Sequence, residues 1–377
     1  MLRRRHSVSW PGQGTPGWLA CVALVATGVL GVSLRGNGQT PALAQYLGIV
    51  QEYRLGRQEG AVRGLTALEY PSVRQAVEEL CRGVESGDPD SPWSLVDVQA
   101  AAVFHSELAI QVMRDSALQW GRQLEIARRL ADVTTRDAVT GKQEPALGRD
   151  FRRRWHLLAA WQAHGLLEMD YLAAEVEKLR RSFGADAELL LTAGSLSETL
   201  AWPALANSLP AGVLGPREPL SRRFYLKDAE AKYRRAVALA PELGEARLRL
   251  GRVLYDQGRY DDALSALEPM LTAPHDTWIR YLGHLFAGAA CERSGRVADA
   301  AAHYRTSVEI RPEAQTGAVA LSFLLRQQGE SGTAREALSP LMSAVMEQGQ
   351  DPWWDYYYGQ WRLVPVALLA MRREVAR

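Results

Sequence analysis

A spaced pattern of small and aromatic residues recurs along the chain and constrains its fold more than any other feature. Residues 229–241 have the pattern A-x3-Y-x2-A-x4-P, and residues 300–312 repeat it at identical spacing with serine in place of the second alanine. Gly258 and Gly295 each open a G-R-x3-A hexapeptide, and Gly329 follows Gly295 by 34 residues. A period close to 34 residues predicts stacked copies of one small structural unit.

Each unit is predicted to be two antiparallel helices joined by a turn. Residues 247–254 place Arg, Leu, Gly and Leu at positions i, i+3, i+4 and i+7, which form one helical stripe. Gly251 and Ala263 lack bulk, so the two helices can approach closely there. Gly258 falls where a helix ends in a left-handed conformation that glycine adopts easily. Because one helix pair cannot bury its apolar stripe alone, neighbouring pairs must stack.

This pattern resembles that of the tetratricopeptide repeat family, in which W-x2-L-G-x2-Y precedes A-x3-F and P. The resemblance covers residues 244–274, 281–314 and, less completely, 315–341. Arg247 and His284 stand where the family often has Trp, and three extra residues are placed in 272–278. The resemblance implies an all-α fold, an α-solenoid of antiparallel helix pairs. An unrelated array of α-hairpins is the alternative.

Residues 1–44 have the composition of an N-terminal signal peptide or membrane anchor. Three arginines, residues 3–5, precede residues 18–34, which carry no charge over 17 positions. Residues 40–45 offer a small-x-small site for cleavage after Ala44. A cleaved secretory signal and an uncleaved anchor both fit, because 17 apolar residues are near the lower limit for spanning a bilayer. Both predict an exported or membrane-anchored protein on the periplasmic or another extracytoplasmic side.

Charge and cysteine content exclude some function classes for the remaining chain. Without residues 1–44, which hold four arginines, 44 − 4 = 40 basic side chains face 43 acidic ones. This balance gives no general attraction to nucleic acid. Cys81 and Cys291 are the cysteines that remain, and buried free thiols are predicted for both.

Residues 45–186 are predicted to be a run of helices, either degenerate repeats or an independent helical cap. A polar break is expected at 140–148. The expected helices cover residues 42–56, 59–68, 73–83, 95–121, 123–133, 155–162 and 171–183.

Residues 187–348 are predicted to be tetratricopeptide repeats with one insertion. Residues 187–200 have the pattern of a first helix, but its partner appears only at 226–239. The segment 202–223 between them is rich in Pro and Gly and predicts no helix. We expect this segment to be an insertion within one helix pair, either as a binding loop or as a tolerated loop, and not a domain linker.

Residues 349–377 are predicted to form aromatic-rich C-terminal capping helices. Residues 353–361 contain six aromatic side chains in nine positions. Such a segment is expected to cover the exposed end of a solenoid. An aromatic platform for a sugar or a peptide is the alternative.

The chain carries no strong catalytic motif. Phosphate-binding, zinc-protease, serine-hydrolase and paired C-x2-C patterns are missing from the sequence. His105 and Glu107 project in different directions from one helix, and His156 and His164 have no third ligand nearby. We therefore predict no enzymatic activity, no cofactor and no metal site.

The family resemblance implies a concave groove lined by the first helix of each pair. A partner peptide or helix is expected to bind there, and the predicted function is a non-catalytic protein-protein interaction scaffold. A cell-envelope carbohydrate-binding or glycan-assembly factor is the alternative. By the resemblance, the groove is lined by Glu245, Leu248, Arg252, Tyr255, Leu282, Leu285, Ala289, Glu292, Thr316, Val319, Phe323 and Arg326. The predicted partner-binding residues among these are Arg252, Tyr255, Glu292, Phe323 and Arg326.

Overall fold

The structure is a computed structural model of the 377-residue chain. It describes residues 40–87, 93–111, 120–136, 141–202, 222–272, 275–343 and 351–376. Most of the predicted signal or anchor segment, residues 1–39, lies outside this part of the chain. Within the described residues, no helix is long and apolar enough to cross a membrane.

The first half of the described chain consists of helices and one short hairpin. Strands β1 and β2 pair antiparallel, with Thr134 opposite Pro145, so a short hairpin lies at the predicted polar break, and the described chain is otherwise helical. Thr40 caps the first helix by accepting a hydrogen bond from the amide of Leu43. Ala44, the predicted cleavage position, therefore lies in the first turn of a helix. The elements are α1 (Pro41–Arg54), α2 (Gln58–Thr66), α3 (Tyr70–Ser86), α4 (Leu95–Gln111), α5 (Trp120–Ala131), β1 (Thr134–Arg136), β2 (Gln143–Pro145), α6 (Arg149–Gly165) and α7 (Met169–Phe183).

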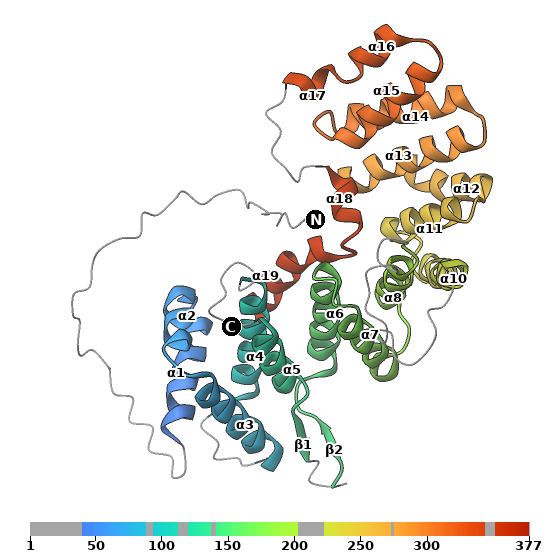
Figure 1. Ribbon diagram of the computed structural model, residues 1–377. Helices are drawn as coiled ribbons and strands as arrows, with labels where there is room; N and C mark the ends of the chain where they lie inside the picture. Colours follow the sequence, from blue (N-terminus) through green and yellow to red (C-terminus); the bar gives the residue numbers. More distant parts are fainter. Residues whose placement is uncertain are drawn as a thin grey trace.

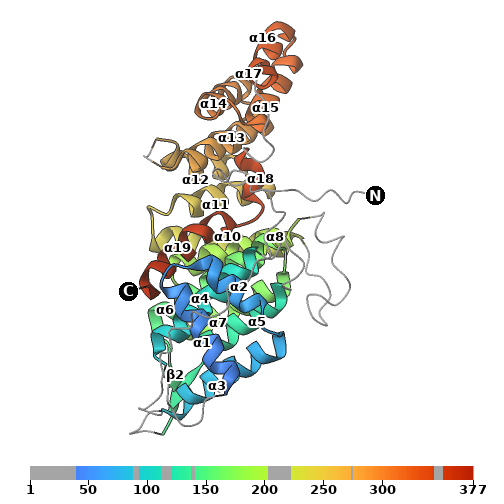
Figure 2. The same ribbon diagram turned by 90° about the vertical axis from the view of Figure 1, so that its left-hand side faces the viewer.

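The second half is a series of antiparallel helix pairs that stack into an elongated array (Figure 2). Gly258, Gly295 and Gly329 have φ values of 78°, 77° and 82°, which confirms the predicted left-handed turns. The elements are α8 (Ala187–Leu200), α10 (Arg222–Leu239), α11 (Gly244–Asp256), α12 (Tyr260–Thr272), α13 (Thr277–Arg293), α14 (Val297–Ile310), α15 (Gln315–Gln327), α16 (Ser331–Glu336) and α17 (Ser339–Ser343).

Small residues set the close approach of the paired helices. A Cβ atom added at Gly251 would lie 2.5 Å from the side chain of Leu267 in α12, and one at Gly194 would lie 2.4 Å from the ring of Tyr233. The second contact joins α8 to α10, which lie on either side of the Pro/Gly-rich segment. The two helices therefore pack as one pair. If the Pro/Gly-rich segment is an insertion within a helix pair, the helices on its two sides must pack in this way. Residues 203–221 of that segment lie outside the described chain.

The C-terminal segment does not cover the end of the array, so the predicted capping arrangement is wrong. It consists of α18 (Pro352–Tyr356), a 3₁₀ turn η2 (Trp361–Leu363) and α19 (Val364–Val375). Helix α18 packs on α13, η2 packs on α6, and α19 packs on α4 and α6. Figure 1 shows this red segment running back from the repeats to the N-terminal helices. The chain end therefore lies beside the helices that begin the described chain.

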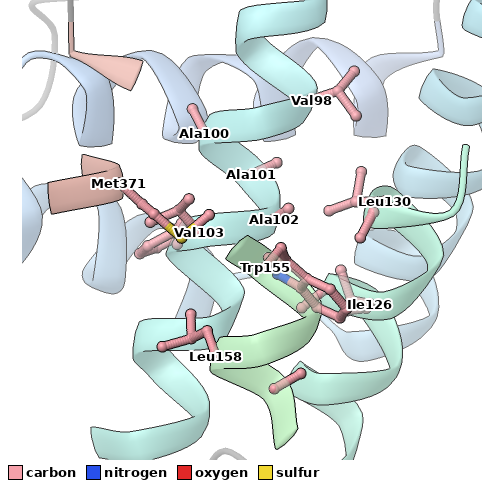
Figure 3. Packing of buried hydrophobic residues seen from close by; sticks show 14 of the residues in the cluster. Val98, Ala100, Ala101, Ala102, Val103, Ile126, Leu130, Trp155, Leu158 and Met371 are labelled. Atoms are coloured by element: carbon pink, nitrogen blue, oxygen red, sulfur yellow. The ribbon is translucent and has the colours of Figure 1, made fainter. Parts of the chain in front are cut away.

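Helix α19 completes the hydrophobic core of the N-terminal half. Its buried residues Leu368, Met371 and Val375 belong to the same core cluster as residues of α1–α7. Figure 3 shows Met371 beside Val103 of α4. The core of this half thus depends on a helix from the far end of the sequence.

Candidate functional site

The inner face of α11 carries a charged stripe. Glu245, Arg249 and Arg252 follow one another at i, i+4 and i+7, so they lie on one side of the helix. Leu248, which the resemblance places in the groove, is fully buried in the core between helices. Leu282 and Leu285 of α13 are likewise core residues. The inner face is therefore more polar than the resemblance implies.

Arg249 is the centre of this stripe, and its side chain is only 2% exposed. Its Nε donates to Glu245 Oε1 at 2.9 Å, and its Nη1 donates to Glu198 Oε2 of α8 at 3.2 Å. Its Nη2 donates to the backbone carbonyls of Tyr356 and Gly359 at 3.0 and 3.2 Å. The guanidinium thus joins two helices of the array to the C-terminal segment through charge-assisted hydrogen bonds.

Both buried carboxylates also accept hydrogen bonds from the C-terminal segment. Glu198 accepts from the hydroxyls of Tyr233 and Tyr356. Glu245 accepts from Gln360 Nε2 at 2.9 Å and from the Arg362 guanidinium. The Arg249 guanidinium and the two carboxylates are thus paired, which makes their burial tolerable. Gln360 Oε1 and Arg362 Nη1 are buried without a hydrogen-bond partner among the described residues.

The electrostatics of the junction favour fixed protonation states. Burial would raise the pKa of Glu245, but the charges of Arg362 and Arg249 outweigh it and lower that pKa to about 2. Burial, together with the charge of Glu198, raises the pKa of Tyr356. At neutral pH the tyrosine hydroxyl is therefore a donor, and the Glu245 carboxylate is an acceptor.

The backbone of the C-terminal segment lies directly on α6. Gly359 has a φ of 59°, and a Cβ added there would lie 2.2 Å from the ring of His164. A Cβ added at Gly165 would lie 2.2 Å from the ring of Trp361. Glycine is thus needed on both sides of this contact: at Gly165 to make room for an indole, and at Gly359 for both its conformation and its space.

The contact continues at both ends of the segment. Asp351 Oδ2 accepts hydrogen bonds from the backbone amide and the hydroxyl of Thr316, at 2.7 and 2.6 Å, at the start of α15. At the other end Arg372 donates to Glu107 of α4, and Arg54 of α1 donates to the carbonyl of Val375 at 3.2 Å. The C-terminal segment therefore runs from the start of α15 in the array to α1 in the N-terminal half.

The structure separates the predicted partner-binding residues into different environments. Arg252 stacks over the rings of Phe286 and Trp353, 5.3 and 5.2 Å from the ring centres, and forms an ion pair with Asp256. Tyr255 lies beside it, with its ring centre 5.1 Å from the Arg252 guanidinium. Arg252 therefore faces the chain's own C-terminal segment, whereas Tyr255 contacts Arg252 and the ring of Tyr260.

The other three predicted residues lie farther along the array. Glu292 accepts a hydrogen bond from the hydroxyl of Tyr304 at 2.8 Å, within its own helix pair. Phe323 is 56% exposed, and Arg326 on the same helix is also exposed. Only the two residues of α15 present side chains that the described chain leaves largely open.

Sequence reasoning missed Glu198, Arg249 and Gln360. The sequence held one signal for Arg249: it lies four positions after Glu245, a predicted groove residue, and this spacing favours an ion pair on one face of a helix. A buried arginine needs acceptors, and two of its acceptors are carbonyls more than one hundred positions away. Periodicity within one helix carries no information about such partners.

The candidate metal and redox positions have structural explanations. His105 is held between the hydroxyl of Tyr46 and the Gln123 side chain, and His156 Nδ1 lies 2.7 Å from Glu175 Oε2. Among the described residues, no group of three or more His, Cys, Asp or Glu side chains is placed to hold a metal ion. Cys81 and Cys291 are free and buried, as predicted.

Comparisons with known proteins identify the repeat. The tetratricopeptide repeat family model matches residues 226–283, which span α10 to the first part of α13. No curated protein sequence matches the chain. The solved structure titled MamA 41-end from Desulfovibrio magneticus RS-1 is 20% identical, covering 53% of this chain and 97% of that chain with a TM-score of 0.38. PilF of Pseudomonas aeruginosa is 16% identical, covering 61% and 89% with a TM-score of 0.43. With the matched pattern, the helix pairs and the left-handed glycines, this chain contains tetratricopeptide repeats, and the family model covers residues 226–283.

Proposed function

We propose that this chain is a non-catalytic protein-interaction scaffold whose partner-binding surface is the exposed side of α15. The observation that carries the proposal is the pair Val319 and Phe323, 53% and 56% exposed, on successive turns of one helix. Arg326 extends the same stripe by a further turn. The C-terminal segment covers the inner sides of α11 and α13 but touches α15 at its first turn, through Thr316.

The chemistry of this stripe suits a protein partner. Two large apolar side chains followed by an arginine match the apolar face of a helix or an extended peptide that ends in an acidic group. Because Phe323 is 56% exposed, its burial would contribute about 1–1.5 kcal/mol to such a complex, roughly half of what a fully exposed ring would contribute. The remaining predicted partner-binding residues Arg252, Tyr255 and Glu292 already have partners within the chain, and we leave them out of this surface.

The aromatic tail gives a carbohydrate little to stack on. Tyr356 is buried, and the rings of Trp353 and Tyr357 pack edge-to-face with centres 5.1 Å apart. Trp354, at 58% exposure, is the large ring of α18 that faces solvent. Outside α18, Tyr358 is 38% exposed. With the other rings of the tail packed on one another, these two give weaker support for glycan binding than α15 gives for a protein partner.

Export is part of the proposal and is supported by the composition of residues 1–44. We propose that the helical array works on the extracytoplasmic side, through a signal or an anchor. Protease treatment of intact cells and of opened cells, followed by detection of the C-terminal half, tests this. If the array stays protected from protease after the outer envelope is opened and the cytoplasmic membrane is left closed, export is contradicted. Recovery of the array in the cytosol would also contradict export.

Site-specific photo-cross-linking tests the binding surface. A benzoylphenylalanine replaces Phe323 in the full chain, and a matched probe replaces Leu239 of α10, which is 55% exposed. We expect a cross-linked protein at position 323 that is missing at position 239, and we expect its binding to the purified chain to fall at least tenfold in Phe323→Ala/Arg326→Glu. Identical cross-links at both positions, or unchanged binding by the double variant, would refute the proposed surface.

A further inference from the structure

The residues 351–362, here called the strap, are bound to the array in the manner of a peptide ligand. We propose that α8, α11 and α13 form a peptide-binding site, which the strap occupies within the same chain. In place of the strap, the site would accept a segment of a partner protein that begins with a tyrosine. That segment would have a glycine three positions after the tyrosine, a glutamine four positions after it and an arginine six positions after it. This proposal does not depend on the exposed surface of α15.

Recognition of the strap begins with its backbone. Arg249 donates to the carbonyls of Tyr356 and Gly359 from one guanidinium nitrogen. Because these contacts require a carbonyl geometry and no particular side chain, they fix the path of the bound segment. Two carboxylates hold the guanidinium itself in place, Glu198 at 3.2 Å and Glu245 at 2.9 Å.

The side chains of the strap are read by acceptors on the array. The Tyr356 hydroxyl donates to Glu198, and Gln360 Nε2 donates to Glu245 at 2.9 Å and to the Ser195 hydroxyl at 3.0 Å. Arg362 donates to the second oxygen of Glu245. The strap supplies the donors and the array supplies two buried carboxylates, so a ligand without these donors would leave buried charge unpaired.

A glycine requirement adds specificity. Gly359 adopts a φ of 59°, and the ring of His164 occupies the place where a Cβ would lie. The imidazole is itself fixed by a 2.8 Å hydrogen bond between its Nε2 and the Thr199 hydroxyl. Any other residue at this position of a ligand would meet both backbone strain and a ring that cannot easily move.

The strap differs from the helix that follows it. Leu368, Met371 and Val375 of α19 belong to the core of the N-terminal half. In the strap, the indole rings of Trp353 and Trp361 and the ring of Tyr357 are partly exposed, and the indole ring of Trp354 is exposed. One strap side chain, Tyr356, belongs to the core of the repeats, whereas four side chains of α19 belong to the core of the N-terminal half. We therefore expect the strap to open at lower free energy than α19.

A competition experiment on the full chain tests the site. The probe is a fluorescein-labelled peptide with the sequence of residues 351–363. In Tyr356→Phe/Gln360→Ala the strap loses donors while the array keeps its acceptors, so we expect the probe to bind this variant at least tenfold more tightly than wild type. The matched control Trp354→Ala changes an exposed strap residue and should bind the probe like wild type.

Two probe variants establish that the recognition is specific. A scrambled peptide, and a peptide with alanine at the position of Gly359, should each bind the double variant at least tenfold more weakly. A double variant that retains wild-type helicity and fails to bind the probe would overturn the proposal. Equal binding of the scrambled peptide would also overturn it.

Hydrogen exchange of the wild-type chain tests the proposal without any substitution. We expect the amides of residues 353–363 to exchange at least tenfold faster than those of α11 and α13, because the strap opens separately. Exchange of the strap only together with α11 and α13 would show that it is a fixed part of the fold, and the proposed site would be wrong.

Discussion

The guanidinium carbon of Arg249 lies 4.3 Å from the centre of the Tyr356 ring, and the same guanidinium donates to the Tyr356 carbonyl at 3.0 Å. The two residues are 107 positions apart in the sequence. Their contact fastens the C-terminal segment to the inner side of the repeats, so the groove in which a partner was predicted is filled there by the protein itself.

Replacing Arg249 with methionine should destabilise the protein strongly. The substitution removes four hydrogen bonds and leaves Glu198 buried without its cation. We expect a loss of about 3–5 kcal/mol in the free energy of unfolding, because an unpaired buried charge remains. Urea denaturation measures it. The control Arg247→Met removes one surface hydrogen bond to Pro241 and should change stability by about 0.5 kcal/mol or less. Equal effects of the two substitutions would contradict the buried junction.

Replacing Gly194 with alanine tests the pairing of α8 with α10. The added methyl would lie 2.4 Å from the buried ring of Tyr233, and overpacking of this kind costs about 1–3 kcal/mol. The control is Gly48→Ala, at an exposed position inside α1 where nothing lies within 4 Å of the added atom. There alanine should stabilise the helix by about 0.5–1 kcal/mol. Thermal or urea unfolding of both variants distinguishes the two outcomes, and a stabilising effect at Gly194 would show that the pair does not pack this closely.

Two buried histidines predict acid sensitivity. Burial lowers the pKa of His105 to about 4, although its hydrogen bond to Gln123 acts in the opposite direction. Burial and the nearby charge of Arg249 lower the pKa of His164 to about 3. Below about 6.5 the unfolded chain therefore binds protons that the folded chain does not, and stability falls as the pH falls.

The size of this effect is measurable. Each histidine should remove roughly 2 kcal/mol of stability between pH 7.5 and pH 5. Glu245, with its pKa lowered to about 2, loses its contribution only below about pH 4.5, outside this window. Unfolding curves of wild type and His105→Gln should converge as the pH falls, because the variant lacks one of the histidines whose pKa burial lowers. Parallel curves would contradict the assignment.

Asp351 should hold the start of the strap. Its carboxylate accepts from the amide of Trp353, as a helix cap, and from the amide and hydroxyl of Thr316. We expect Asp351→Ala to cost about 1–2 kcal/mol and to speed proteolysis within residues 351–362. Asp355→Ala, an exposed position of the same helix, is the control and should leave the cleavage rate near that of wild type. Equal cleavage rates for the two variants would contradict the proposed role of Asp351.

The sequence was sufficient to predict the helix pairs of the repeats. Small residues such as Gly251 and Ala263, and left-handed turns such as Gly258, act within one unit of about 34 residues, so their spacing is visible in the chain. The pairing of α8 with α10 could also be predicted, because Gly194 and Tyr233 keep the pattern on either side of the Pro/Gly-rich segment.

The path of the C-terminal segment could not be predicted in the same way. Its aromatic composition suits an end cap as well as an inner-face position, and the choice depends on matching Tyr356 and Arg362 to Glu198 and Glu245. Those partners lie in helices whose own periodicity is complete without the tail. For the same reason Arg252 was predicted to face a partner, although it faces Trp353 of its own chain.

The most direct test of the central claim asks where the tail lies in solution. A benzoylphenylalanine in place of Trp361 in the full chain is activated by light, and the cross-linked peptides are identified by mass spectrometry. Because the Trp361 ring packs on Gly165, the account predicts cross-links within the chain to residues of α6. Cross-links confined to α15, α16 and α17 would mean that the tail covers the end of the array, and would contradict the account.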